Sequence, residues 1–386
     1  MKEQKIGLCI AYTGTNYGQL LQAYATQQII RKKGFHTEII KYYSGNNKGV
    51  KLSYGALVVA LKHIISMIKK RVVKPSVSRD DELHKKNRFM RKEMADQFRK
   101  YRLNDVVQCN GIDELRNKSK EYFAVLVGSD QVWLPDVAVS NFYTLRFAAS
   151  GVRRISYATS LGVSAYPNYV KKSARDFWRQ IDYLSVREQK GKEIIQSIID
   201  IPVEVVADPT YLFTKDEWKE LIPEGKVIAD GYLLCYFLGD SDPIKKYARR
   251  VADEKGLRLV SILSDECCSD DNQYADEVLV GRSVEDFVNL IRNADFVLTD
   301  SFHGLAFSVI HQKQFLVFYR KRIGVKQSRN SRIDNILHVW GIEDRLVREP
   351  EKAIVPVENI DYDKVSGKVD ELRASSLNFL NKALVD

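Results

Sequence analysis

The residues with the clearest chemical potential follow a buried apolar run in the second half of the chain. Residues 296–299 read as a strand, Ser301, His303 and Gly304 lie in the polar turn after it, and a helix is expected over 305–311. Ligands bind beyond the carboxyl ends of strands in open parallel sheets, and a helix N-terminus attracts anions. The loop is therefore typical of a phosphate or carboxylate site. A lone histidine is more often structural, but His303 stands where a ligand would enter.

An arginine stands at a comparable place in the first half of the chain. Arg187 ends the predicted strand 183–187, so its guanidinium should lie at the carboxyl edge of that sheet. A planar guanidinium suits bidentate binding of a carboxylate or a phosphate. The spacing leaves a second interpretation open, in which Arg187 only forms a surface ion pair with Glu188.

A third loop combines a carboxylate, an amide and an indole within a few residues, at 127–133 (VGSDQVW). Asp130 could bond the hydroxyl groups of a sugar while Trp133 stacks on its ring, with Ser129 beside them. The commoner use of an aspartate after a strand is to cap the next helix, and this alternative stays open.

The opening strand leads into a loop of small and polar residues. Asn16, Tyr17 and Gly18 close the segment 12–18 (YTGTNYG), before a helix that starts near Gln19. The glycines would let backbone N–H groups approach an anion at the helix N-terminus. The loop lacks the GxGxxG spacing and the Walker lysine, so a plain strand-to-helix turn is an equally good interpretation.

Apolar runs alternate with helix-patterned segments along most of the chain, which predicts α/β domains with mostly parallel sheets built from βαβ units. Strands are expected at 5–11, 36–42, 122–127, 154–159, 183–187, 203–207, 232–238, 258–263, 277–280, 296–299 and 314–319. A chain of 386 residues exceeds what one core usually holds. We therefore expect an N-terminal domain over 1–212, a C-terminal domain over 213–355, and a terminal helix within 356–386 that returns to the first domain.

The net charge of +10 is concentrated in one segment. Residues 51–104 hold 15 Lys and Arg against 5 Asp and Glu, and we interpret them as a basic helical insertion in the first domain. The stretch 54–73 reads as an apolar helix with basic residues toward its end. It suits either peripheral contact with an anionic membrane or packing on the protein, and packing is slightly favoured. Residues 81–102 are expected to form a charged, solvated helix.

Other features of the composition favour a cytoplasmic globular protein, with peripheral contact at the inner face of the membrane as an option. No stretch reaches the roughly 18 uncharged apolar residues that a membrane span needs, and the first apolar run is too short for a signal peptide. The five cysteines lack metal-ligand spacing, so we expect free thiols and no metal. Nucleic acid is not an expected partner, because stacking aromatics do not alternate with the positive charges.

Six segments occur in a fixed order along the chain: GTNYGQLLQAYA, LVGSDQVW, ISYATSLG, LSVREQKG, VVADPTYLF and ADFVLTDSFHGLAFS. This ordered set resembles the polysaccharide pyruvyl transferase family from about Ile6 to beyond Gly341. The resemblance implies a fold like that of GT-B glycosyltransferases, with two Rossmann-like domains and an active site in the cleft between them. The basic segment 51–102 looks like a variable insertion.

The resemblance also implies a reaction. Family members move pyruvate from phosphoenolpyruvate onto two hydroxyls of a sugar, as a cyclic ketal in capsule, exopolysaccharide or cell-wall polymers. Arg187 falls on the family's SVR motif and is expected to bind the donor; His303, in its S-x-HG motif, is expected in donor binding and catalysis, with Ser301 and Gly304 beside it. The first loop of the family falls on Asn16, Tyr17 and Gly18. A late basic residue of many members has several counterparts here, namely Arg320, Lys321, Arg322, Lys326 and Arg332.

The implied chemistry fits these residue types. The methylene carbon of the donor is protonated, a sugar hydroxyl attacks the oxocarbenium-like centre, phosphate leaves and a second hydroxyl closes the ring. This requires a cationic grip on the donor, a general acid and a general base. Arg187 and the helix after Ser301 would supply the grip, His303 the acid or base near neutral pH, and Asp130 the activation of the acceptor.

No cofactor is required by this route. Phosphoenolpyruvate and a sugar acceptor, with a lipid-linked oligosaccharide as one option, are the expected partners. The main alternative is a GT-B glycosyltransferase that uses a nucleotide-sugar donor, since it would share the fold and a phosphate-binding second domain.

Overall fold

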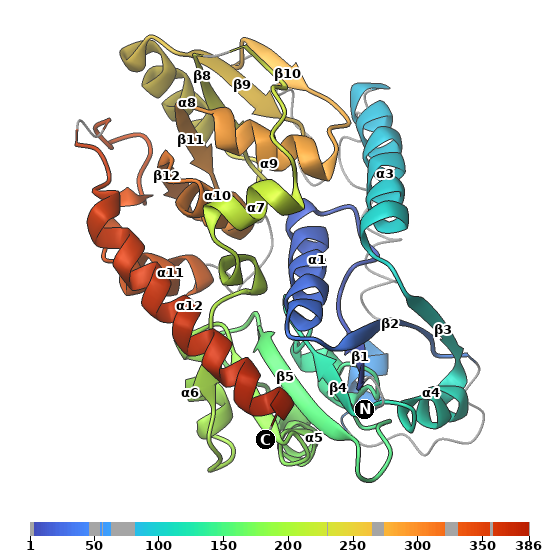
Figure 1. The fold of residues 1–386 in the computed structure, drawn as a ribbon. Helices are drawn as coiled ribbons and strands as arrows, with labels where there is room; N and C mark the ends of the chain where they lie inside the picture. Colours follow the sequence, from blue (N-terminus) through green and yellow to red (C-terminus); the bar gives the residue numbers. More distant parts are fainter. Residues whose placement is uncertain are drawn as a thin grey trace.

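Two all-parallel sheets form the framework of the chain in a computed structural model (Figure 1). The structure describes residues 4–45, 55, 57–62, 82–229, 231–264, 274–320, 331–355 and 358–385. The strand orders are β3-β2-β1-β4-β5-β6-β7 and β10-β9-β8-β11-β12-β13, and all neighbouring strands pair in parallel. Each sheet runs from its third strand back to its first and then outward, which is the Rossmann order. The predicted α/β class, with two Rossmann-like and mostly parallel sheets, is confirmed.

The first sheet contains the strands of the N-terminal half. Its strands are β1 (Lys5–Cys9), β2 (His36–Tyr43), β3 (Val106–Asn110), β4 (Ala124–Val127), β5 (Arg153–Thr159), β6 (Tyr183–Val186) and β7 (Glu204–Val205). The helices of this half are α1 (Tyr17–Lys32), α4 (Gly111–Ser119), α5 (Asn168–Trp178) and α6 (Gln189–Gln196), with the 3-10 turns η1 (Pro135–Val139) and η2 (Pro209–Leu212). Strand β4 is buried throughout, as expected for a central parallel strand covered on both faces. Strand β3 is absent from the sequence prediction because this edge strand is largely exposed and carries no apolar run.

The second sheet repeats this plan. Its strands are β8 (Tyr232–Tyr236), β9 (Arg258–Ile262), β10 (Glu277–Leu279), β11 (Phe296–Thr299), β12 (Gln314–Phe318) and β13 (Leu346–Val347). Its helices are α7 (Lys215–Leu221), α8 (Asp242–Lys255), α9 (Val284–Asn293), α10 (Phe302–Ile310) and α11 (Ser331–Trp340), with the 3-10 turn η4 (Glu343–Arg345). A capping box between Ser283 and Asp286 starts α9. The sequence prediction also lacks β13, because two residues leave no periodicity to detect.

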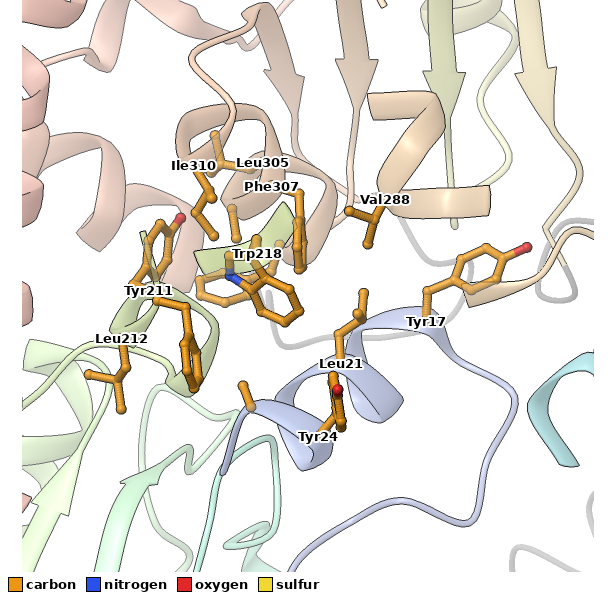
Figure 2. Close-up of a cluster of buried hydrophobic side chains, with 14 of the residues drawn as sticks. Tyr17, Leu21, Tyr24, Tyr211, Leu212, Trp218, Val288, Leu305, Phe307 and Ile310 are labelled. Atoms are coloured by element: carbon orange, nitrogen blue, oxygen red, sulfur yellow. The ribbon is translucent and has the colours of Figure 1, made fainter. Parts of the chain in front are cut away.

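An apolar cluster joins the two halves of the chain (Figure 2). Tyr17 of α1 stacks on Phe287 of α9 at 4.6 Å between ring centroids, and Tyr211 of η2 meets Trp340 of α11 edge-on at 5.0 Å. Such aromatic pairs contribute about 0.5–1.5 kcal/mol beyond their buried area. The cluster therefore holds α1 beside α9 and α10, which places the start of α1 next to the start of α10.

Helix α3 (Glu82–Arg102) bridges the two halves along one side of the molecule (Figure 1). The prediction of a solvated helix is wrong for one of its faces, because its side chains there bond to both halves. Asn87 donates to the Leu263 carbonyl and accepts from the Gly281 N–H, while Arg91 donates to the carbonyl of Thr15. Most of the predicted helix 54–73, for which packing on the protein and membrane contact were both considered, lies outside the described residues. No described helix is both long and apolar enough to cross a membrane.

The terminal helix α12 (Tyr362–Val385) runs along both halves (Figure 1). Its Ser376 hydroxyl accepts a hydrogen bond from the Ala207 N–H at 2.8 Å. The ring centroid of its Phe379 lies 6.2 Å from that of Tyr157 in β5. Together with α3 and the apolar cluster, α12 fixes the two sheets against one another.

Candidate active site

The loops at the carboxyl ends of the two sheets meet at one cluster of charged side chains. In the first sheet the strand order reverses between β1 and β4, and in the second between β8 and β11. Asp130 follows β4, and His303 follows β11 in the first turn of α10. Ligands of doubly wound sheets bind at such reversal points. The imidazole Nε2 of His303 lies 3.8 Å from a carboxylate oxygen of Asp208, which follows β7, so groups of the two halves lie in one cluster.

Arg187 stands at the centre of this cluster. Its Nη1 donates to Asp208 Oδ2 at 2.7 Å, and its Nη2 lies 3.4 Å from Asp130 Oδ1. Its Nε lies 3.8 Å from Glu188 Oε2, and the arginine side chain is only 2 % exposed. Burial alone would lower the pKa of Arg187, but the attraction of Asp208 and the other two carboxylates outweighs burial and raises the pKa. The ion pair with Glu188 considered from the sequence thus belongs to a buried network and not to the surface.

Asp208 is fixed by hydrogen bonds on both of its oxygens. Oδ2 accepts from Ser129 Oγ at 3.0 Å in addition to Arg187, and Oδ1 accepts from the N–H and hydroxyl of Thr210 at 3.1 and 2.9 Å. Burial raises the pKa of Asp208, yet His303, Arg187 and the Thr210 N–H together lower it. Asp208 therefore stays ionised although it is almost fully buried.

His303 is held by the start of α10 and by the backbone of α1. Ser301 caps α10 by accepting from the Gly304 N–H at 3.3 Å. A Cβ atom at Gly18 would lie 1.9 Å from His303 Nδ1, so only glycine allows α1 this close to the ring. A Cβ atom at Gly304 would similarly meet Thr299 Oγ1 at 2.4 Å. Both glycines are required by packing.

The imidazole of His303 is neutral at physiological pH. Burial lowers its pKa to about 4; Asp208 and Asp130 oppose this shift, and Arg187 and Arg332 add to it. This differs from the sequence expectation of a histidine that exchanges protons near neutral pH. The pKa of His303 is lower than that expectation because the ring is buried and because Arg187 and Arg332 repel a proton on it.

Arg332, in the first turn of α11, brings a second cation to the cluster. Its guanidinium carbon lies 5.6 Å from the centroid of the Phe302 ring, and that of Arg187 lies 4.7 Å from the same ring. Burial and the repulsion of Arg187 lower the pKa of Arg332 to about 9, although Asp130 and Glu188 oppose this. Within the described part of the chain, no carboxylate forms an ion pair with Arg332.

Several buried polar atoms in the cluster have no hydrogen-bond partner among the described residues. They are Arg187 Nε, Arg332 Nε, His303 Nε2 and Glu188 Oε2. A buried polar atom left unbonded costs about 1–3 kcal/mol, so their concentration in one place is characteristic of a binding site. Three belong to side chains that can donate to an anion and one is a carboxylate oxygen, which together suit a ligand with both acidic and hydroxyl groups.

Two of the predicted binding residues, Asn16 and Tyr17, support the fold instead of facing the cluster, and Ser129 acts within the cluster only by holding Asp208. Asn16 caps α1 by accepting from the Gln19 N–H, and Tyr17 donates to the carbonyl of Arg282 across the domain boundary. Ser129 is buried and donates to the Ala158 carbonyl as well as to Asp208. Lys321 lies outside the described residues.

The predicted role of Trp133, stacking on a sugar ring, is wrong. Its indole is 1 % exposed, lies against Phe177 and Trp178 in the core, and donates to the Tyr143 carbonyl. It therefore offers no face on which a sugar could stack. Asp130 is partly exposed and cannot cap the next helix as considered, because turns follow it instead of a helix.

The cluster can be compared with known proteins. Residues 16–322, which include the first loop, Arg187 and His303, match the family described as polysaccharide pyruvyl transferase. The chain belongs to this family. No curated protein matches it.

Solved structures of UDP-N-acetylglucosamine 2-epimerases and of a glycosyltransferase are similar to this member of the pyruvyl transferase family over nearly its full length. A putative UDP-N-acetylglucosamine 2-epimerase from Listeria monocytogenes has 11% identity and a TM-score of 0.47, covering 97% of this chain and 91% of its own. The glycosyltransferase SnogD from Streptomyces nogalater has 10% identity and a TM-score of 0.45, covering 99% of this chain and 100% of its own. The UDP-GlcNAc 2-epimerase from Methanocaldococcus jannaschii has 12% identity and a TM-score of 0.46, covering 95% of this chain and 92% of its own.

Two cluster residues of this pyruvyl transferase family member were missed by sequence reasoning. In the sequence, Asp208 only follows the predicted strand 203–207, and Phe302 only lies within the segment ADFVLTDSFHGLAFS. The available signal for Asp208 was its position directly after an apolar run, the same signal that pointed to Asp130. For Phe302 only its neighbours in the sequence, Ser301 and His303, gave a signal.

Proposed function

We propose that the chain transfers pyruvate from phosphoenolpyruvate onto two hydroxyls of a polysaccharide sugar as a cyclic ketal. Membership of the pyruvyl transferase family supports a transferase with a polysaccharide acceptor. The observation that carries the proposal is the set of unbonded donor atoms on Arg187, Arg332 and His303 at the start of α10. A small, highly charged acid is the ligand that this set would bind best.

The donor's phosphate and carboxylate groups would be bound mainly from the C-terminal half. Arg332 has no carboxylate partner among the described residues, so its charge is available to a ligand. Arg187 already bonds Asp208 through Nη1 and Asp130 through Nη2, and its Nε has no hydrogen-bond partner among the described residues. The N-terminus of α10 adds a partial positive charge close to both side chains.

Proton transfer would be divided between His303 and Asp130. An anionic donor next to a neutral imidazole raises its pKa, so donor binding would let His303 take up a proton. From there the proton can pass to the methylene carbon of the donor. Asp130, ionised and partly exposed, would accept a proton from the attacking hydroxyl. The C–O bond to phosphate then breaks, and phosphate leaves with the proton that Asp130 accepted. The second hydroxyl closes the ring and gives its proton to His303, which restores both side chains.

The test is a direct assay of both products. The purified protein is incubated with phosphoenolpyruvate and oligosaccharide acceptors, free in one arm and lipid-linked in the other. Phosphate release with a matching pyruvate adduct on the acceptor, seen by mass spectrometry, is the expected result. Consumption of a nucleotide sugar without dependence on phosphoenolpyruvate would favour the glycosyltransferase alternative and overturn the proposal.

A further inference from the structure

Asp208 is the most firmly anchored acid of the cluster and takes no direct part in the chemistry described above. Hydrogen bonds from Ser129, Arg187 and Thr210 occupy both of its oxygens. The residue also caps the 3-10 turn η2, which begins with Pro209. A carboxylate held in this way cannot turn to follow a moving partner, so its orientation is built into the first half of the chain.

The same carboxylate lies opposite one nitrogen of His303. Oδ2 is 3.8 Å from Nε2, a distance too long for a hydrogen bond but short for two groups that can carry opposite charges. Nε2 has no hydrogen-bond partner among the described residues. Nδ1, on the other side of the ring, lies next to the Cα of Gly18. Elements of the first half thus contact both nitrogens of a histidine that belongs to the second half.

We propose that Asp208 is a positioning residue that keeps the proton of neutral His303 on Nε2 and leaves Nδ1 as the nitrogen that gains and loses a proton. The inference rests on the proposed function, because it assigns the exchanging nitrogen of a histidine already given the proton-transfer role. A negative charge facing Nε2 favours the tautomer that places N–H there. When Nδ1 takes up a proton, the imidazolium carries N–H on both nitrogens, and Asp208 stabilises it. When Nδ1 releases the proton to the donor's methylene carbon, the Nε2–H tautomer returns.

The other charges near the ring do not replace Asp208. Asp130 also attracts a proton to His303, but less strongly than Asp208, while Arg187 and Arg332 repel it. Glu188 faces the two arginines. Removing the charge of Asp208 therefore leaves the histidine among cations, and the imidazolium becomes harder to form.

The first experiment observes the tautomer and needs no enzymatic activity. Nitrogen-15 NMR of the full-length protein with labelled histidine, at neutral pH and without ligand, reports which ring nitrogen carries the proton, and His303→Gln assigns the signal. We expect protonated Nε2 and unprotonated Nδ1. The opposite tautomer in the wild-type protein would overturn the inference. Because this test holds even if no pyruvyl transfer is detected, failure of the proposed function and failure of this inference are distinguishable.

The second experiment measures turnover in Asp208→Asn, which removes the charge and keeps the shape. We expect kcat to fall at least about 10-fold with a smaller change in the KM for phosphoenolpyruvate, since loss of a general acid or base outright costs about 100- to 10,000-fold. The matched control is Thr210→Val, which removes one anchoring hydroxyl and leaves the charge, and should keep the Nε2–H tautomer. Wild-type kcat and an unchanged tautomer in Asp208→Asn would contradict the assignment. If that variant does not fold, the tautomer of His303 measured in the wild-type protein tests the inference by itself.

Discussion

The two sheet edges that meet at the site differ in how their charged groups are paired. On the first edge Asp130 and Asp208 each form an ion pair with Arg187, and the pKa values of all three shift toward the charged forms. On the second edge His303 and Arg332 have pKa values shifted toward the neutral forms, to about 4 and about 9. The charged groups of the first edge therefore already have partners of opposite charge in the ligand-free protein. An anionic ligand would stabilise the charged forms of the second edge more than those of the first.

Replacing the histidine of the second edge should have the largest effect on catalysis. His303→Gln removes the side chain to which we assign proton transfer to the donor, so kcat should fall about 100- to 10,000-fold. Phosphate release in the presence of acceptor measures the loss. His338→Gln is the control, because His338 is exposed and far along α11, paired with Glu343. Turnover within a few-fold of wild type in His303→Gln would remove this residue from the mechanism.

On the first edge, by contrast, the same kind of change should mainly affect stability. Arg187→Met leaves Asp208 buried without its cation, and breaking a buried ion pair costs about 3–5 kcal/mol. Chemical denaturation should show this drop in the free energy of unfolding. Lys190→Met breaks an exposed pair with Glu193, worth about 0–1 kcal/mol at most, and serves as the matched control. Equal stability of the two variants would show that the first edge is not held by its buried pairs.

The second edge also predicts how stability depends on pH. Because the folded-state pKa of His303 is about 4 and the ordinary value is near 6.5, the unfolded chain binds the extra proton between these values. The free energy of unfolding should therefore fall as pH drops from 6.5 to 4, by about 3 kcal/mol for this group. Buried His311, with a pKa of about 3, further lowers the free energy of unfolding as the pH falls.

Denaturation of wild type and His303→Gln across this pH range separates the two contributions. The variant should keep the share of His311 and lose that of His303, so its stability should fall less steeply below pH 6.5. Parallel curves for the two proteins would show that burial does not disfavour the charged form of His303.

A substitution with a smaller expected effect, at the contact between α1 and His303, should disturb the alignment of the two sheet edges. Gly18→Ala places a Cβ where the His303 ring lies, and overpacking of this kind costs about 1–3 kcal/mol. We expect the ring to shift and kcat to fall, measured with the same assay, alongside a lower melting temperature. Gly34→Ala is the control for adding a methyl group, since a Cβ there meets no atom within 4 Å, although its φ of +88° makes this change strained as well. A kcat in Gly18→Ala no lower than in this control would show that the close approach of α1 is not needed.

The features that could be predicted from the sequence are those with local signals. Apolar runs indicated the central strands, and turn residues after β4, β6 and β11 indicated Asp130, Arg187 and His303. Edge strands β3 and β13 have no such run. The burial of Trp133 and the second contact face of α3 depend on neighbours distant in sequence. The role of Asp208 depends on the pairing of β6 with β7, which brings it beside Arg187.

The central claim is that Arg332, which has no carboxylate partner among the described residues, binds the anionic donor. Calorimetric titration of phosphoenolpyruvate into the wild-type protein and into Arg332→Gln tests it most directly. Hydrogen bonds to charged groups contribute about 1.5–3 kcal/mol, so we predict binding to the wild type and affinity about 10- to 100-fold weaker in the variant. Equal affinity in the two proteins would contradict the account.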